Sequence, residues 1–305
     1  MNLFYNPDEK RLRAGWRLFL QFVLMLALLA AGQVMLGLLG SPDGFLFDRI
    51  FSAFAFIVST WVAARYLDGR SFHALGISLS KKWMRELGMG MAIGGLAIAF
   101  IFLLHLLAGW IDFTGYGWQR GWNQMYPLPL FSYLLGMLLV GFYEELVFRG
   151  YQITNMIEGF ASSQSHTRYS VVGAILLSSS IFGILHAGNP NSSIISTINI
   201  MFAGVVLALP YLITGSLALS AGLHAAWNFF QGGIFGLPVS GTSARSSLLQ
   251  VRETGPDLFT GGQFGPEAGL TGIMGMFLIV LLVYQYTRSA GYAFKLHDKF
   301  IHSAE

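Results

Sequence analysis

The stretch Gly141-Phe142-Tyr143-Glu144-Glu145-Leu146-Val147-Phe148-Arg149-Gly150 decides how the rest of the chain is interpreted. It continues an apolar run that begins near Leu130, so two adjacent carboxylates and an arginine are predicted to lie on a helix inside a membrane. Charged side chains at such depth cost several kcal/mol each, and ionisable groups that persist there usually serve a function. The stretch therefore predicts a membrane-embedded chemical site.

The composition of the chain is that of a polytopic membrane protein. Of its 305 residues, 54% are hydrophobic and 11% are charged, against about a quarter charged in ordinary soluble domains. The absence of cysteine excludes disulfides, thiolate metal sites and a cysteine nucleophile. A formal charge of +3, spread over loops, excludes a nucleic-acid partner. Membrane lipids are the expected surroundings.

Eight apolar segments are each interpreted as a membrane helix, from their lengths and from the Gly, Pro and polar residues between them. The fold expected is all-α, with about eight transmembrane helices, at 18–39, 49–66, 88–107, 130 through the acidic stretch, 170–186, 195–213, 216–230 and 269–286. The first is expected to be an uncleaved anchor. Segment 70–86 mixes aromatic and basic residues and is expected to lie at the membrane interface.

The basic residues predict the orientation of these helices. With the amino terminus inside, thirteen Lys and Arg fall on inner loops and four on outer loops, namely Arg49, Arg120, Arg245 and Arg252. This asymmetry follows the positive-inside rule, so a multi-pass protein of the plasma membrane with both termini in the cytoplasm is expected.

Four regions follow from this topology. Residues 1–128 carry the first three helices, the cytoplasmic tail and the interfacial segment, and 129–230 form the helical core with the polar residues discussed below. Residues 231–268 form a Gly-rich extracytoplasmic loop, and 269–305 hold the last helix and a cytoplasmic tail. The loop ends in Gly261-Gly262-Gln263-Phe264-Gly265-Pro266-Glu267, which indicates ordered turns. Loops of this length are often functional, although a flexible connector also fits.

The two acids of the opening stretch are expected to differ. Glu145 and Arg149 are one helical turn apart on the same face, so they can form an ion pair. Glu144 points about 100° away from Glu145 and has no local cation. It is either protonated and inert, or it faces a polar cavity and binds a water or a metal.

Two further helices offer polar side chains at membrane depth. One ends in Phe182-Gly183-Ile184-Leu185-His186, and another carries His224 and Asn228, whose spacing puts imidazole and amide on one face. A lone histidine is as often a packing residue as a ligand. The three helices together supply a carboxylate, two imidazoles and an amide, which indicates one shared site.

The depth of each side chain in the membrane tests whether the three helices share one site, because a helix rises about 1.5 Å per residue. From an inner end near Ser170, His186 would lie about 24 Å into the membrane. Glu144 reaches the same level only if its helix continues past Gly150 to about Gly159. The sequence therefore predicts a long fourth helix that ends near Gly159.

Two kinds of hydrolytic chemistry fit this set. A carboxylate and an imidazole that share a water can deprotonate it for attack on a carbonyl. Alternatively Glu144, His186 and His224 could hold a divalent metal such as zinc, a His₂Glu set used by zinc hydrolases. The residues leave both alternatives open, and no cofactor is certain.

The motifs Glu144-Glu145-x-x-x-Arg149, Phe182-x-x-x-His186 and His224-x-x-x-Asn228 resemble, in this order, the three signatures of the CPBP family. This family of intramembrane proteases includes Rce1-like CAAX endopeptidases and bacterial Abi proteins. The resemblance implies that Glu144 and His186 activate the water and that His224 and Asn228 form the oxyanion site. Glu145 and Arg149 would be supporting residues, and Phe182 would shape the pocket.

The leading hypothesis is therefore an intramembrane endopeptidase, of glutamate or metal type, that hydrolyses a peptide bond of a membrane-associated protein or peptide. Two alternatives stay open. One is a non-enzymatic bacteriocin-immunity or scaffold protein, because Abi-type relatives are linked to self-immunity. The other is a proton-coupled transporter, against which the lack of an inverted repeat counts.

Overall fold

The structure, a computed structural model, describes residues 3–7, 9–38, 44–119, 126–161, 167–244 and 246–301. Arg120 and Arg245, two of the basic residues assigned to outer loops, lie outside the described residues.

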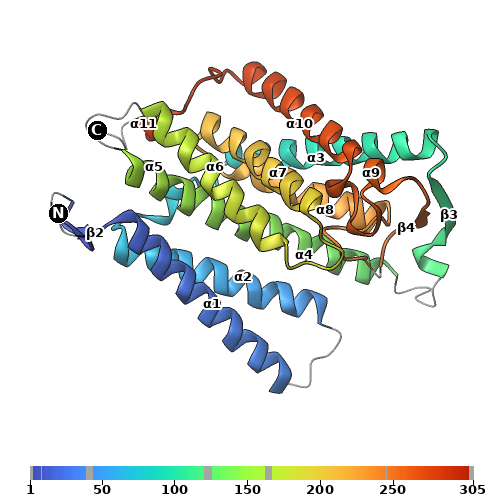
Figure 1. Ribbon diagram of the computed structural model, residues 1–305, viewed down its shortest axis with the longest axis horizontal. Helices are drawn as coiled ribbons and strands as arrows, with labels where there is room; N and C mark the ends of the chain where they lie inside the picture. The colour runs from blue at the N-terminus through green and yellow to red at the C-terminus, as the bar shows by residue number, and fades with distance from the viewer. Residues whose placement is uncertain are drawn as a thin grey trace.

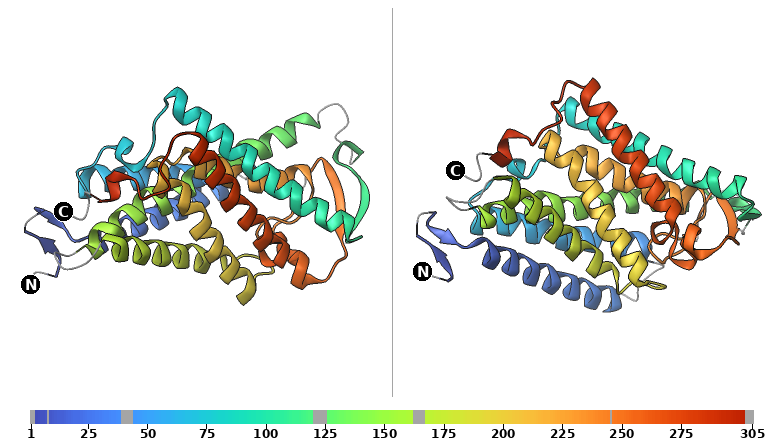
Figure 2. Two further views of the ribbon diagram at one scale, coloured as in Figure 1. Left: turned by 90° about the horizontal axis from the view of Figure 1, so that it is seen from above. Right: turned by 45° about the horizontal axis from the view of Figure 1, so that its top comes forward.

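Within these ranges, seven helices are long and apolar enough to cross a membrane. They are α1 (Ala14–Leu38), α2 (Phe45–Val62) with its π-helical end (Ala63–Leu67), α3 (Lys81–Leu107), the continuous helix of α4, η5 and α5, α6 (Thr167–His186), α7 (Ile194–Thr214) and α10 (Leu270–Ser289). In Figures 1 and 2, α1 and α10 lie on opposite flanks of the bundle. The predicted all-α polytopic fold is confirmed.

The fourth helix is as long as the depth argument requires. It runs unbroken through α4 (Pro127–Glu145), a π-helical segment η5 (Leu146–Ile153) and α5 (Thr154–Phe160). The prediction that it passes Gly150 and ends near Gly159 is confirmed. The local widening at η5 was not predicted, and such π-helical insertions are frequent at functional sites.

The segment expected as an eighth span is a shorter helix inside the bundle. It consists of α8 (Ala218–Asn228) and a π-helical extension η6 (Phe229–Ile234), and every residue of α8 is buried. Helix α8 packs on α3, α4 and α7. A Cβ at Gly90 or Gly94 of α3 would lie 2.3 or 2.5 Å from a carbonyl oxygen of α8, so glycine at these two positions allows the close approach of the helices.

One boundary was predicted wrongly. Helix α3 begins at Lys81 and not at Gly88, because the Ser80 side chain accepts a hydrogen bond from Trp83 N at 3.2 Å and caps it. Lys, Arg, Met and Leu after this cap are good helix formers. The remainder of the expected interfacial segment forms a short 3₁₀ turn, η2 (Phe72–Leu75).

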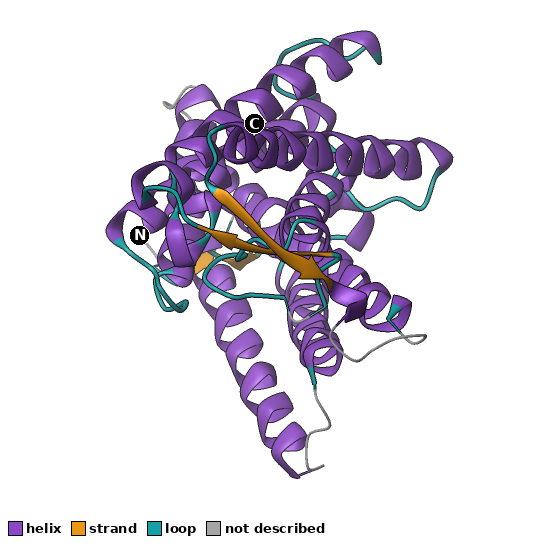
Figure 3. Ribbon diagram, turned by 90° about the vertical axis from the view of Figure 1, so that its right-hand side faces the viewer, coloured by secondary structure: helices purple, strands orange, loops and turns teal. Residues whose placement is uncertain are grey.

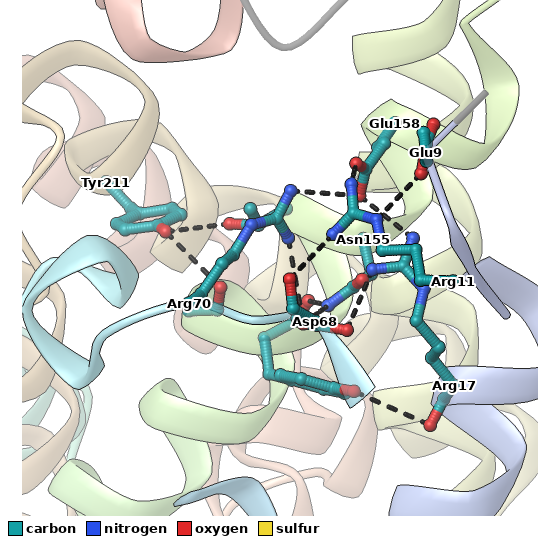
Figure 4. A network of polar contacts seen from close by, with 11 residues as sticks. Glu9, Arg11, Arg17, Asp68, Arg70, Asn155, Glu158 and Tyr211 are labelled. Carbon is teal, nitrogen blue, oxygen red and sulfur yellow. Dashed lines mark hydrogen bonds and ion pairs between the residues drawn. The ribbon is translucent and has the colours of Figure 1, made fainter. Parts of the chain in front are cut away.

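Both chain ends lie at one end of the bundle, which we call the terminal end (Figure 1). The strands β1 (Tyr5–Asn6) and β2 (Arg11–Leu12) and the short helix α11 (Asp298–Ile301) are found there. A buried ionic network joins α1, the end of α2 and α5 (Figure 4). In it, Arg17 contacts Asp68 at 2.7 Å and Glu158 at 3.0 Å, and Arg70 contacts Glu158 at 2.9 Å. The network holds the far end of the long fourth helix in place.

The opposite end, which we call the loop end, is ordered by the two long connections. Strand β3 (Ile111–Tyr116) pairs antiparallel with β4 (Leu249–Glu253), and this pair crosses in front of the helix ends in Figure 3. Beyond β4 the chain forms the short turns α9 (Asp257–Thr260), η7 (Gly262–Phe264) and η8 (Pro266–Ala268), and η3 (Gly117–Gln119) follows β3. The prediction of ordered turns at 261–267 is confirmed.

Candidate active site

The opening stretch lies where α4 packs most tightly on α8. A Cβ at Gly141 would lie 2.6 Å from Ala225 N and 2.8 Å from Ala221 O, so only glycine allows this approach. Glu144 and Glu145 follow on the last turn of α4, and both are then within reach of the His224 side chain on α8. The glycine thus brings the first and third motifs together.

Glu145 and Arg149 form the ion pair predicted from their spacing. Arg149 Nη1 lies 3.1 Å from Glu145 Oε1, and both side chains are almost completely buried. Arg149 also donates to the Gly204 carbonyl of α7 at 3.1 Å, and its guanidinium lies 4.6 Å from the centre of the Phe182 ring. Arg149 therefore connects the fourth helix with α6 and α7.

His224 is held between the two carboxylates. Its Nδ1 lies 2.9 Å from Glu145 Oε1, and its Nε2 lies 3.8 Å from Glu144 Oε2. A carboxylate paired with Arg149 can only accept, so Nδ1 is the nitrogen that donates to Glu145. The contact between Glu145 and His224 was missed in the sequence, because helical spacing relates residues on one helix and not residues on two.

Glu144 stands apart from the buried pair, as expected. Its side chain is 16% exposed, and its Oε2 is buried without a hydrogen-bond partner in the part of the chain that the structure describes. Buried carboxylate oxygens normally have such a partner, often an ordered water. Glu144 is thus the acid that can bind an additional molecule.

His186 lies at the end of α6 and is oriented by its own helix. Its Nδ1 lies 2.7 Å from the Phe182 carbonyl, and a carbonyl oxygen only accepts, so Nδ1 carries the proton. In the neutral ring, Nε2 then keeps a lone pair that can accept a proton. The Phe182 ring centre lies 4.6 Å from that of His186 and 6.1 Å from that of His224, so Phe182 packs against both imidazoles.

A small cavity of about 50 Å³ lies beside these residues. Its wall includes Phe182, His186, His224 and Asn228, and helices α7 and α10 supply apolar side chains, among them Ile200, Ala203, Met276 and Ile279. The volume is enough for more than one water. The structure thus brings both histidines and the amide to one space, while Glu144 reaches it through its contact with His224.

The cavity wall also contains two polar loop residues that were not predicted from the sequence. Ser240 and Glu267 come from the outer loop 231–268 and line the same cavity. Glu267 is 3% exposed, and this burial raises its pKa to about 7. The turn-rich stretch that ends in Glu267 was the available signal, but nothing in it indicated that the loop folds back over the helices.

The donor set does not fit a metal ion as it is arranged. No group of three His, Cys, Asp or Glu side chains in the described ranges is placed to hold one metal. Glu144 Oε2 lies 3.8 Å from Nε2 of His224, and Nδ1 of His186 is already bound to the Phe182 carbonyl. The zinc alternative of Glu144, His186 and His224 therefore stays a prediction that this arrangement does not support.

Comparisons with known proteins agree with the motif assignment. Residues 126–230 match the family of Rce1-like proteins, described as type II CAAX prenyl endopeptidases, which confirms the resemblance recognised from the three motifs. Over 259 residues the chain is 26% identical to the "Uncharacterized protein YyaK" of Bacillus subtilis (strain 168), covering 75% of this chain and 81% of that protein. No solved structure matches the chain.

Proposed function

We propose that this protein is an intramembrane endopeptidase that hydrolyses a peptide bond of a membrane-associated protein or peptide. The match of residues 126–230 to a protease family supports hydrolysis in general. The proposal depends mainly on the row Glu145, His224 and Glu144, in which Nδ1 and Nε2 of one imidazole face two carboxylates at 2.9 and 3.8 Å beside a small cavity.

In this proposal Glu144 is the general base. Its unpartnered Oε2 accepts the proton of a water whose other contact is Nε2 of His186. The water oxygen bonds to the substrate carbonyl carbon, and the carbonyl electron pair moves onto its oxygen. When the tetrahedral intermediate collapses, the carbon–nitrogen bond breaks and the leaving amine takes the proton from Glu144. The proton balance then needs no further group.

His224 and Asn228 stabilise the oxyanion. Asn228 follows His224 by one helical turn and lines the cavity with it. With the His224 ring doubly protonated between the two carboxylates, its Nε2–H and an amide N–H of Asn228 can both point to one oxygen. Loss of one such donor typically lowers kcat by about 100- to 1,000-fold. Glu145 does not touch substrate in this scheme and is a positioning residue for His224, fixed in turn by Arg149.

The test is cleavage of a library of membrane peptides by purified protein in liposomes. Glu144→Gln and His186→Ala should each lower kcat by at least about 100-fold, since general acid and base groups contribute that much. His73→Ala, at an exposed histidine outside the site, is the matched control and should cleave normally.

Other outcomes contradict the proposal. The immunity or scaffold alternative would be favoured if all variants cleave equally. It would also be favoured if none cleaves while the mutated proteins still protect cells against a bacteriocin. Proton flux into liposomes that is lost in Glu144→Gln would favour transport. Metal in the purified protein that is lost in Glu144→Ala would replace the glutamate mechanism by a metal-dependent one.

A further inference from the structure

Glu267 is a buried acid that the proposed mechanism does not use. It lies in η8, just before α10, and it accepts hydrogen bonds on both carboxyl oxygens. Gln231 Nε2 donates to Oε2 at 2.7 Å, while the Ser240 backbone N–H and hydroxyl lie 3.1 and 3.4 Å from Oε1. Burying a carboxyl is costly without such partners, so their arrangement makes this a built contact and not a chance one.

These partners lead to the two helices that carry the histidines. Gln231 belongs to η6, which continues α8 directly beyond His224 and Asn228. The Ser240 carbonyl accepts a hydrogen bond from Asn189 Nδ2 at 3.1 Å, and Asn189 lies in the turn that follows His186. Through Gln231 and Ser240, Glu267 therefore links the helix that carries His224 and Asn228 to the turn that follows His186.

The same region is packed too closely to be a loose connector. Ser240 has a φ of 44°, a conformation that costs a non-glycine residue of order 1 kcal/mol and persists only where the surroundings hold it. A Cβ at the next residue, Gly241, would lie 1.8 Å from the Pro190 carbonyl oxygen. The outer loop thus rests directly on the turn after His186.

We propose that Glu267 is a positioning residue of the active site, which closes the outer loop over the cavity and fixes the spacing between His186 and the His224–Asn228 helix. We call Ser240 and Glu267, the two loop residues that line the cavity, the roof. This inference rests on the proposed peptidase function for its effect on catalysis, but the closure itself can be measured without any substrate.

The chain contains no cysteine, so a single introduced thiol is a clean reporter. Ala203→Cys places one on α7 in the cavity wall beneath the roof. In liposomes, a small charged methanethiosulfonate added outside should label this thiol at least about 10-fold faster when Glu267→Ala is also present, because opening then needs no rupture of the roof contacts. Glu267→Gln keeps an acceptor oxygen, and labelling should stay within about 3-fold of the parent.

The matched control is Asp112→Ala, which removes an exposed acid from the same end of the molecule and should not change labelling. If Glu267→Ala lowers the yield of folded protein, Gln231→Leu removes one donor to the same carboxyl and should also speed labelling. Equal labelling rates in the parent, Glu267→Ala and Gln231→Leu would overturn the proposal.

Catalysis provides the second readout. Glu267→Ala should lower kcat for peptide cleavage by about 10-fold or more with little change in KM, and Glu267→Gln should restore it, since misplacement of about 1 Å can cost 100-fold. If the parent itself cleaves nothing, the peptidase proposal fails, and the labelling rates still decide whether Glu267 closes the roof. Normal cleavage by Glu267→Ala in a protein that is labelled slowly would refute the positioning role.

Discussion

Removing the charge of Glu145 should rescue a protein that has lost Arg149. In Arg149→Met, the carboxylate of Glu145 stays completely buried and loses the cation 3.1 Å away. Breaking a buried pair from one side costs about 3 to 5 kcal/mol, because the remaining charge is uncompensated. The double variant Arg149→Met with Glu145→Gln removes that charge while keeping the side-chain shape.

The size of the rescue follows from the contacts. The bond of Arg149 to the Gly204 carbonyl and its contact with Phe182 are lost in both proteins and cancel in the comparison. Glu145→Gln also weakens the bond to His224 Nδ1, which offsets about 1 kcal/mol of the gain. We therefore expect the double variant to be about 2 kcal/mol more stable than Arg149→Met alone.

Unfolding in mixed micelles at increasing SDS fraction, followed by tryptophan fluorescence and circular dichroism, measures this difference. Glu144→Gln in the Arg149→Met background is the control, because the ion pair within 4 Å of Arg149 is made by Glu145, so neutralising Glu144 should rescue less than neutralising Glu145. If the double variant is as stable as Arg149→Met or less stable, the buried pair is not the interaction that holds the site together.

Three further predictions concern other parts of the molecule. Gly94→Ala should destabilise the bundle by about 1 to 3 kcal/mol, since the new Cβ would lie 2.5 Å from the Leu223 carbonyl. Gly88→Ala on the same helix places its Cβ in open space and should stabilise the bundle by about 0.5 kcal/mol. SDS unfolding measures both changes. Arg17→Met should cost about 3 to 5 kcal/mol because Asp68 is left buried, while Arg252→Ala, which breaks an exposed pair with Asp112, should cost less than about 1 kcal/mol in the same assay. Burial raises the pKa of Glu267 from 4.5 to about 7, so between these pH values its carboxyl binds a proton in the closed roof and loses it in the open one. The free energy that favours the closed roof therefore falls as pH rises through this window, by about 3 kcal/mol at most. Labelling of Ala203→Cys, corrected for thiol ionisation with the Glu267→Gln protein, should therefore accelerate from pH 5 to 8. The same slope in both proteins would assign the pH dependence to a group other than Glu267.

Much of this protein could be read from the order of its residues. Hydrophobic length determines which segments can cross a membrane, because an unpaired backbone in lipid must form a helix. The second and third motifs contain four residues of the cavity wall, and the first motif contains the two acids that contact His224. The ion pair of Glu145 with Arg149 and the long fourth helix were also predictable, since both depend on spacing along one helix.

Other features depend on which helices lie side by side. The burial of α8 and its short length follow from close contacts with α3 and α4, and sequence periodicity does not specify a neighbour. The same limit applies to His105, which we would expect to extend toward the membrane surface. It is instead fully buried and bonded to Thr271 Oγ1 at 2.9 Å, a residue of the last helix.

Glu144 and Glu145 show most clearly which contacts can be predicted from spacing along one helix and which depend on how the helices pack. Spacing along the chain was enough to predict that Glu145 pairs with Arg149 and that Glu144 is left without a local cation, because a helix turns by about 100° per residue. The packing of separate helices adds that His224 lies between the two acids and that Glu267, more than a hundred residues away, lines the same cavity as His224. These contacts join separate helices and a loop, and their geometry is determined by packing, which no spacing along the chain encodes.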